Sequence, residues 1–105
     1  MNSYYVYILQ CADKSYYTGV TNNLDRRIAE HNSDDSYISY TAKRQPLALI
    51  YSEEFCDIRQ AIELEKQIKG WTRRKKEAFI AGNWDELKKL SRNNNDPQND
   101  NQDSK

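Results

Sequence analysis

Two charged or polar side chains in one short segment stand where a helical pattern predicts apolar ones. Between residues 24 and 31, Leu24 and Ile28 define one face of the expected helix. At about 100° per residue, Arg27 and His31 fall on that same inner face, whereas Arg26 points away. A histidine beside apolar residues is often only structural. An arginine there, however, is a group that could hold a phosphate.

A carboxylate occupies a similar position in a second segment. The apolar side chains of this helix share one face, and Glu65 lies in the middle of it, whereas Glu63 lies on the opposite, solvent side; the apolar members are Ile58, Ala61, Ile62 and Ile68. A carboxylate on a core-facing stripe is costly unless it is paired or binds a cation. Two interpretations stay open, namely a salt bridge to Arg27 or to a lysine, and a metal ligand.

Two tyrosine-rich segments precede these helices. Tyr5 and Tyr7 lie in the first, and Tyr16 and Tyr17 in the second. Tyrosines could converge with the inward arginine, histidine and glutamate on one pocket. An arginine, a cation-binding carboxylate and groups that transfer protons are what phosphodiester hydrolysis requires.

The elements that must position these side chains follow from local pattern. β-Forming residues predict strands, and capping residues ahead of apolar periodicity predict helices. The expected strands are 4–10, 15–20 and 47–53, and the expected helices are 24 to about 32, 57 to about 69, 72–81 and 83 to about 90. Residues 33–46 are polar and predict an irregular segment. This order favours an α+β fold with a small three-stranded antiparallel sheet flanked by helices.

Length and composition limit the classes that remain. Of 105 residues, the last fifteen carry no apolar side chain, so we expect one domain over 1–90 and a disordered polar tail over 91–105. No apolar run reaches the roughly 18–20 residues of a membrane span, and no export signal is present. Cys11 and Cys56 predict two free thiols, although a disulfide is possible. Three glycines cannot build a phosphate loop or a dinucleotide fingerprint, so no organic cofactor is expected.

The charge is balanced overall, at 16 basic and 16 acidic residues, but it is unevenly placed. The run from residue 66 to 76 holds six basic side chains and no acid. Such a run is typical of a surface that binds a phosphate backbone, or is merely a solvated helix face with its countercharges elsewhere. Trp71 within it could stack on a base or pack on the next helix. We expect DNA contacts from this run, or from the earlier loop; the residues are Lys69, Arg73, Arg74, Lys76, Lys43 and Arg44.

The ordered motifs resemble those of a known family. Tyr5-Val6-Tyr7, followed ten residues later by Tyr17-Thr18-Gly19, resembles the paired motif that names the GIY-YIG nuclease superfamily. The segments 19–27 and 61–69 resemble the parts that carry the family's arginine and its glutamate. The resemblance covers residues 4 to about 80. It looks closest to small stand-alone bacterial members related to the N-terminal domain of the excision-repair endonuclease.

This resemblance implies roles for individual residues. Tyr7 and Tyr17 match the motif tyrosines, and His31 stands where members carry a histidine or tyrosine that shares in proton handling. Arg27 matches the catalytic arginine. Glu65 matches the glutamate that holds one divalent ion, Mg²⁺ or Mn²⁺. Gly19 and Asn23 match structural positions of the motifs.

Several positions depart from the family pattern. Thr18 replaces isoleucine in the second motif, and Val20 stands where the repair nucleases carry a lysine. No asparagine after Glu65 matches the one that closes the motif set in larger members, and Glu77 stands near that place.

The sequence therefore predicts a cytoplasmic, metal-dependent DNA endonuclease domain that hydrolyses phosphodiester bonds, in DNA repair or recombination. The alternative is a non-catalytic DNA-binding or protein-interaction module that retains the nuclease fold. DNA is the expected partner, and no membrane is expected. The oligomeric state is not indicated by the sequence.

Overall fold

The structure is a computed structural model that describes residues 2–33 and 38–94. The chain forms two compact units. The first, Met1–Lys69, contains the sheet, and we call it the sheet unit. The second, Gly70–Lys105, contains helices in its described part, and we call it the helical unit. The two units are described separately below.

Three antiparallel strands form the centre of the sheet unit. They are β1 (Tyr4–Gln10), β2 (Tyr16–Thr21) and β3 (Ala48–Phe55), in the order β2-β1-β3. Strand β1 pairs with both neighbours, and its register with β3 shifts between Ile8 and Leu9. A tight turn joins β1 to β2, in which Lys14 adopts a positive φ of 73° and the Asp13 side chain accepts hydrogen bonds from Ser15.

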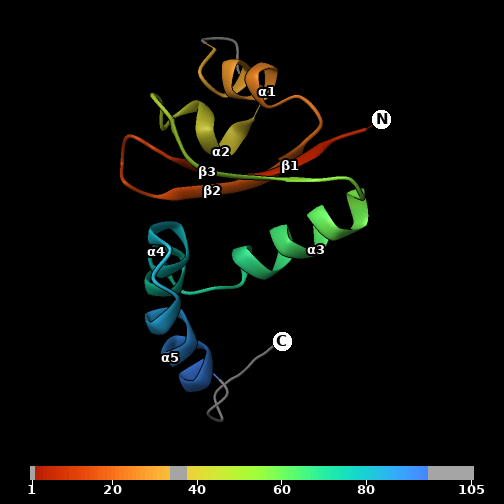
Figure 1. Ribbon diagram of the computed structural model, residues 1–105. Coiled ribbons are helices and arrows are strands. Elements are labelled where there is room, and N and C mark those ends of the chain that lie inside the picture. The colour runs from red at the N-terminus through yellow and green to blue at the C-terminus, as the bar shows by residue number, and fades with distance from the viewer. Residues whose placement is uncertain (1, 34–37, 95–105) are drawn as a thin grey trace. The chain divides into compact units, whose positions relative to one another are not determined.

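Helices cover both faces of this sheet (Figure 1). Helix α1 (Leu24–His31) and the short α2 (Ser39–Ala42) lie on one face, and α3 (Ile58–Lys69) lies on the other. Helix α1 begins after Asn23, whose side-chain oxygen accepts a hydrogen bond from the Arg26 backbone N–H at 3.1 Å. This capping of one unsatisfied N–H fixes the first turn and hence the directions in which later residues of α1 point.

Strand alternation divides the core into two layers. Tyr7, Leu9 and Cys11 are buried together with Leu47, and Leu24 and Ile28 of α1 pack against them. Val6 and Ile8, which alternate with these residues, are fully buried too. Because successive side chains of a strand point to opposite faces, they lie on the face that α3 covers. Strand β1 is therefore buried on both faces, which explains its nearly continuous apolar sequence.

In the helical unit, α4 (Arg73–Ala81) packs against α5 (Trp84–Asn94). The Thr72 hydroxyl caps α4, and Gly82 ends it with φ of +72°, a left-handed conformation that favours glycine. Trp71 makes an edge-on contact with Phe79 at 5.2 Å between ring centroids, and Phe79 contacts Trp84 in the same way. Trp71 thus packs on the following helix, as one of the two interpretations of this residue predicted.

The structure confirms the predicted α+β class and the three-stranded antiparallel sheet. Three local expectations were wrong. Segment 33–46 contains the short α2, β3 extends to Phe55, and the last helix continues to Asn94 instead of ending near Leu90. A disordered tail was expected over residues 91–105. Residues 91–94 belong to α5, and residues 95–105 lie outside the described part. Cys11 and Cys56 are both free thiols, as predicted.

A close approach between β1 and β2 depends on the absence of a side chain at Gly19. Gly19 lies opposite Tyr7 in the strand register, and the Tyr7 ring lies across it. A Cβ at Gly19 would lie 2.5 Å from the Tyr7 hydroxyl oxygen and 2.6 Å from the ring carbon that bears it. Neither atom can move freely, because the Tyr7 ring is buried.

We therefore expect Gly19→Ala to destabilise the protein by about 1–3 kcal/mol, the usual range for overpacking a filled core. Urea unfolding followed by circular dichroism measures the loss. In a Tyr7→Phe background the loss should be smaller, because the closest of the clashing atoms is gone. Unchanged stability in Gly19→Ala would contradict this packing.

Candidate active site

A chain of hydrogen bonds runs from β1 through α1 to α2 in the interior of the sheet unit. The Tyr7 hydroxyl lies 2.9 Å from Nε2 of His31, and Nδ1 of His31 lies 2.8 Å from the Thr41 hydroxyl. All three side chains are buried. The Thr41 hydroxyl also donates to the carbonyl oxygen of Ile38, at 3.3 Å.

The directions of both hydrogen bonds depend on the tautomer of His31. The Thr41 hydroxyl has a single hydrogen, and when this hydrogen is given to Ile38 the hydroxyl accepts from Nδ1–H of His31. A neutral imidazole protonated at Nδ1 has an unprotonated Nε2, and this nitrogen accepts the hydrogen bond from the Tyr7 hydroxyl. His31 therefore presents a proton acceptor to Tyr7.

The surroundings keep both of these groups neutral. Burial lowers the pKa of His31, and the positive charge of Arg27 lowers it further, with Glu30 acting in the opposite direction. Burial likewise raises the pKa of Tyr7, and negative charge on Tyr17, Glu65 and Glu30 raises it more, whereas Arg27 lowers it. Tyr7 therefore remains a hydroxyl donor at neutral pH.

Tyr17 connects this buried chain to the surface. Its ring centroid lies 4.9 Å from that of His31 and 6.3 Å from that of Tyr7. On its other side it contacts Tyr40 of α2, at 5.9 Å, and Tyr40 is largely exposed. Tyr17 is only half-buried, so it is the more accessible of the two motif tyrosines.

Arg27 and Arg26 differ in the way the helical spacing predicts. The Arg27 side chain is 31% exposed and the Arg26 side chain 65%. Both form ion pairs with Glu30, at 3.7 Å for Arg27 and 3.8 Å for Arg26. The positive charge of Arg27 lowers the pKa of both Tyr7 and His31.

Glu65 also differs from its neighbour Glu63 as predicted. Its side chain is 16% exposed, whereas Glu63 is an exposed residue. The carboxylate forms an ion pair with Lys69, one helical turn further on, at 2.7 Å. The sequence left a salt bridge to Arg27, a salt bridge to a lysine and a metal ligand open for Glu65, and the structure shows the salt bridge to a lysine. Glu65 still contributes to the raised pKa of Tyr7, so its charge acts on the same cluster.

The cation-binding capacity of this region rests on Glu65. Within residues 2–33 and 38–94, no three histidine, cysteine or carboxylate side chains come together as a metal site. Magnesium does not need such a cage, because it keeps several waters and is held by one or two carboxylates together with substrate phosphates. A single partly exposed carboxylate such as that of Glu65 fits that kind of site, and a cation would replace the Lys69 ammonium there.

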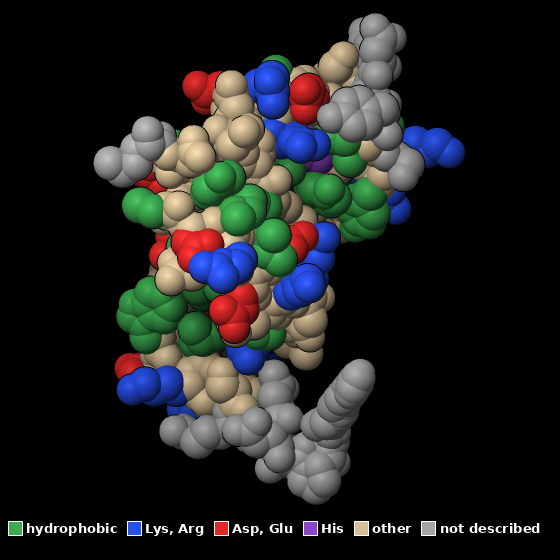
Figure 2. Space-filling view, turned by 90° about the vertical axis from the view of Figure 1, so that its right-hand side faces the viewer, with side chains coloured by type: hydrophobic (Ala, Val, Ile, Leu, Met, Phe, Trp, Pro, Cys, Tyr) green, Lys and Arg blue, Asp and Glu red, His purple; other side chains and the backbone are tan. Residues whose placement is uncertain are grey.

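The predicted DNA-binding residues belong to both units, Lys43, Arg44 and Lys69 to the sheet unit and the others to the helical unit. Arg44 pairs with Asp13 at 3.1 Å, and its guanidinium lies over the Tyr40 ring at 4.1 Å from the centroid; Lys43 beside it is exposed. In the helical unit, Arg73 pairs with Glu77 and Arg74 with Glu86, each at 3.1 Å. The basic run 66–76 thus has acidic partners outside its own segment, as expected if it is a solvated helix face. Figure 2 shows basic side chains interspersed with acidic ones.

Lys75 and Lys76 complete the basic run of the helical unit. Lys75 lies over the Trp71 ring, with its ammonium 4.7 Å from the centroid. Burial lowers the pKa of both lysines, and Arg73 lowers that of Lys76 further.

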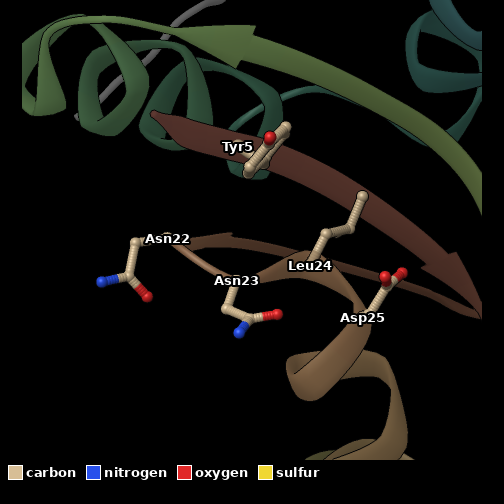
Figure 3. A pocket seen from close by; sticks show the side chains of 5 residues that line it. All are labelled: Tyr5, Asn22, Asn23, Leu24 and Asp25. Atoms are coloured by element: carbon tan, nitrogen blue, oxygen red, sulfur yellow. The ribbon is translucent and has the colours of Figure 1, made fainter. Parts of the chain in front are cut away.

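Asn23 serves the structure of α1, and it also borders a surface hollow (Figure 3). Tyr5 of β1 contributes to this hollow together with Asn22, Asn23, Leu24 and Asp25 from the junction of β2 and α1. None of the predicted catalytic side chains lines it. The hollow is therefore separate from the Tyr7–His31 cluster.

The sequence did not identify Thr41 or Glu30 as parts of this region. Thr41 lies in a polar segment with no apolar period, so nothing local marks it as buried. Glu30 lies three residues after Arg27, a spacing at which helical side chains meet, and this spacing could have indicated the ion pair.

Comparisons with known proteins agree with this architecture. The model of the GIY-YIG catalytic domain family matches residues 3–78. A UPF0213 protein from Limosilactobacillus reuteri is 45% identical over 91 residues, which cover 86% of this chain and 95% of that protein. The chain therefore belongs to the GIY-YIG family and is a member of its UPF0213 group.

Solved structures of relatives show the same fold. The solution NMR structure of a UPF0213 protein from Bacillus halodurans has a TM-score of 0.52 at 39% identity, covering 85% of this chain and 97% of that one. The solution NMR structure of a protein from E. faecalis has a TM-score of 0.57 at 36% identity, covering 78% and 86%. In the described residues of the present chain, none of the helices has the length and apolar character needed to cross a membrane.

The buried His31 predicts how stability depends on pH. The unfolded chain takes up a proton near the ordinary histidine pKa of 6.5, whereas the folded protein does so only at lower pH. Below pH 6.5 the unfolded state thus binds more protons, and stability falls as the pH is lowered toward the folded-state pKa. We expect the thermal unfolding midpoint to decrease from pH 7 to pH 5.

His31 is the only histidine, so a His31→Gln variant removes this titration selectively. Its midpoint should change less over the same interval. Parallel curves for the two proteins would show that His31 is not held in its neutral form.

Proposed function

We propose that the protein is a divalent-metal-dependent endonuclease that hydrolyses phosphodiester bonds of DNA. The observation that carries this proposal is the cluster of motif side chains around Tyr7. The Tyr7 hydroxyl lies 2.9 Å from Nε2 of His31, and the Tyr17 ring lies 6.3 Å from the Tyr7 ring and 4.9 Å from the His31 ring, between ring centroids. The charges of Arg27 and Glu65 lower and raise the pKa of this hydroxyl, respectively. Membership in the GIY-YIG catalytic domain family supports a nuclease.

Arg27 is the proposed phosphate-binding group. Guanidinium groups bind phosphate oxygens through paired N–H donors, and they stabilise the charge that develops as the phosphate is attacked. The Arg27 ion pair with Glu30 is partly exposed and long, at 3.7 Å, so it is weak and can yield to a phosphate. Arg26, further out, would add only general attraction for the DNA backbone.

The proposed route for the proton ends at His31. Tyr17 is half-buried and would orient the attacking water, because Tyr7 and His31 are buried behind it. This step requires that Tyr17 admit the water to the Tyr7 oxygen, which would then take up the water's proton as the Tyr7 proton passes to Nε2 of His31. Hydroxide and an imidazolium result, and the lowered pKa of His31 keeps its Nε2 free to accept at neutral pH.

Glu65 would hold one divalent ion, Mg²⁺ or Mn²⁺. When bound, this ion supplies stabilisation for the negative charge on the leaving oxygen. Glu65 contributes its carboxylate, and Lys69 keeps this carboxylate ordered and charge-compensated until the ion replaces it. The Lys69 side chain is 53% exposed, so it can turn toward the DNA. This fits the expectation from the sequence that Lys69 contacts DNA.

Finer features of this proposal rest on the motifs and on the composition of the sequence. They are a relation to the N-terminal domain of the excision-repair endonuclease, a setting in DNA repair or recombination, a cytoplasmic location, a nuclease domain over residues 1–90, and a polar tail over 91–105. The alternative function is a DNA-binding or protein-interaction module without turnover. The Lys69 pairing of Glu65 favours this alternative, because it occupies the expected cation position.

Glu65→Gln should reduce cleavage by about 10²-fold or more, because the amide cannot hold the divalent ion. Supercoiled, branched and single-stranded DNA are incubated with Mg²⁺ or Mn²⁺, and the products are separated on gels. Glu63→Gln is the matched control, since it removes the same charge from the exposed face of α3 and should leave the rate nearly unchanged. Equal rates in the two variants would contradict the role of Glu65, and no cleavage by the unaltered protein would favour the non-catalytic module.

Substituting Arg73, Arg74 and Lys76 together by glutamine should weaken binding to every DNA sequence alike. Binding to phosphates releases counterions, so the slope of log affinity against log salt should flatten by roughly 0.9 for each phosphate that the variant no longer neutralises. Folding should hardly change, because exposed ion pairs contribute only about 0–1 kcal/mol each. Fluorescence anisotropy at several salt concentrations measures the slope.

The matched control for this variant neutralises Lys88 and Lys89 of α5, which are exposed in the same unit. This control should retain the original slope. An unchanged slope in the triple variant would mean that the run is only a solvated helix face, and that DNA contacts the Lys43–Arg44 loop instead.

A further inference from the structure

A buried residue that contacts the His31 ring lies in a segment that the motifs do not include. Helix α2 has only four residues, and its Thr41 is fully buried. The Thr41 hydroxyl is 2.8 Å from Nδ1 of His31, on the side of the imidazole opposite Tyr7. We propose that Thr41 is a positioning residue that fixes His31 in the Nδ1–H tautomer, so that Nε2 is always the acceptor for the Tyr7 hydroxyl.

The direction of the Thr41 hydroxyl is itself fixed. Its hydrogen is used in the bond to the Ile38 carbonyl oxygen, so an oxygen lone pair is what His31 meets. A hydroxyl that turned freely would serve either tautomer, whereas one that donates to Ile38 accepts from His31. Burial removes competing water from both groups, which raises the cost of any arrangement that leaves Nδ1–H unpaired.

Backbone hydrogen bonds hold Thr41 in place on both sides of the chain. The Thr41 N–H donates to Ile38, and the Thr41 carbonyl accepts from the Arg44 N–H at 2.9 Å. The Arg44 carbonyl in turn accepts from the Ala12 N–H, next to the end of β1, at 2.9 Å. The Gln45 side chain donates to the carbonyl of His31 itself at 2.9 Å. Segment 38–45 is thereby tied to both elements that carry Tyr7 and His31.

The other charges near His31 do not select a tautomer. Arg27 and Glu30 act on the total charge of the imidazole, with opposite signs. Tyr7 can either donate to Nε2 or accept from it, because a phenol does both. Thr41 is therefore the group in the described structure that distinguishes Nδ1 from Nε2. The consequence for catalysis rests on the proposed nuclease function, whereas the tautomer itself does not.

The test uses nitrogen-15 NMR of the imidazole, which reports directly which ring nitrogen carries the proton. His31 is the only histidine, so its signals are assigned without ambiguity. At a pH above its pKa, the unaltered full chain should show an unprotonated Nε2 and a protonated Nδ1. Thr41→Ser retains the hydroxyl and should show the same pattern. Thr41→Val keeps the shape but removes the acceptor, so it should shift the ring toward the Nε2–H tautomer.

Two results would overturn the proposal. One is an Nε2–H tautomer in the unaltered protein, which needs no variant and so does not depend on whether Thr41→Val folds. The other is an unchanged Nδ1–H tautomer in folded Thr41→Val, as judged by its circular dichroism and amide spectrum.

Cleavage assays on the same proteins separate this proposal from the proposed function. If the protein is a nuclease, Thr41→Val should lose about 10-fold to 10²-fold in single-turnover rate with unchanged DNA affinity, and Thr41→Ser should recover most of it. Full cleavage by a Thr41→Val protein whose tautomer has shifted would overturn the catalytic consequence. Absence of cleavage by the unaltered protein, with the NMR pattern as expected, would contradict the nuclease and leave the tautomer assignment supported.

Discussion

The buried Tyr7 hydroxyl is the point on which the rest of the sheet unit depends. It occupies the space that Gly19 leaves in the neighbouring strand, and from there it forms a hydrogen bond with His31. The pairing of β1 with β2 thus fixes the position of the Tyr7 hydroxyl. His31, in the last turn of α1, must lie within hydrogen-bond distance of it, and this sets the distance between β1 and α1. A buried polar network of this kind stabilises one arrangement only when all of its members are satisfied, and here Thr41 completes it.

The surroundings of Tyr7 also divide the candidate site into an inner and an outer part. Tyr7, His31 and Thr41 form the inner part, which is closed to solvent and electrically neutral. Tyr17, Arg27 and Glu65 form the outer part, which is partly exposed and carries the charges. Under the proposed function, a phosphate and a cation would be bound by the outer part, whereas a proton would be taken up by the inner part. This separation keeps the proton acceptor neutral although a cationic arginine lies nearby.

Much of this arrangement could be predicted from the sequence, because it depends on short-range periodicity. The helical period distinguished Arg27 from Arg26 and Glu65 from Glu63, and strand patterns located β1 and β2 to within a residue. The burial of Thr41 could not be predicted, since it depends on the tertiary packing of a segment that has no period of its own. The division of the chain into two compact units was not predicted either, because Gly70 and Thr72 mark a turn between helices and indicate nothing about which helices form a unit.

Two adjacent arginines that share one ion-pair partner allow the most direct test of the site. Arg26 and Arg27 both contact Glu30 and carry the same charge, but only Arg27 acts on the buried chain. The single-turnover rate of DNA cleavage with Mg²⁺, measured for Arg27→Ala and Arg26→Ala at saturating protein, separates chemistry from binding. We predict a loss of about 10²–10³-fold for Arg27→Ala, and a nearly unchanged rate for Arg26→Ala. Equal losses in the two variants, or no loss in either, would contradict the proposed role of Arg27.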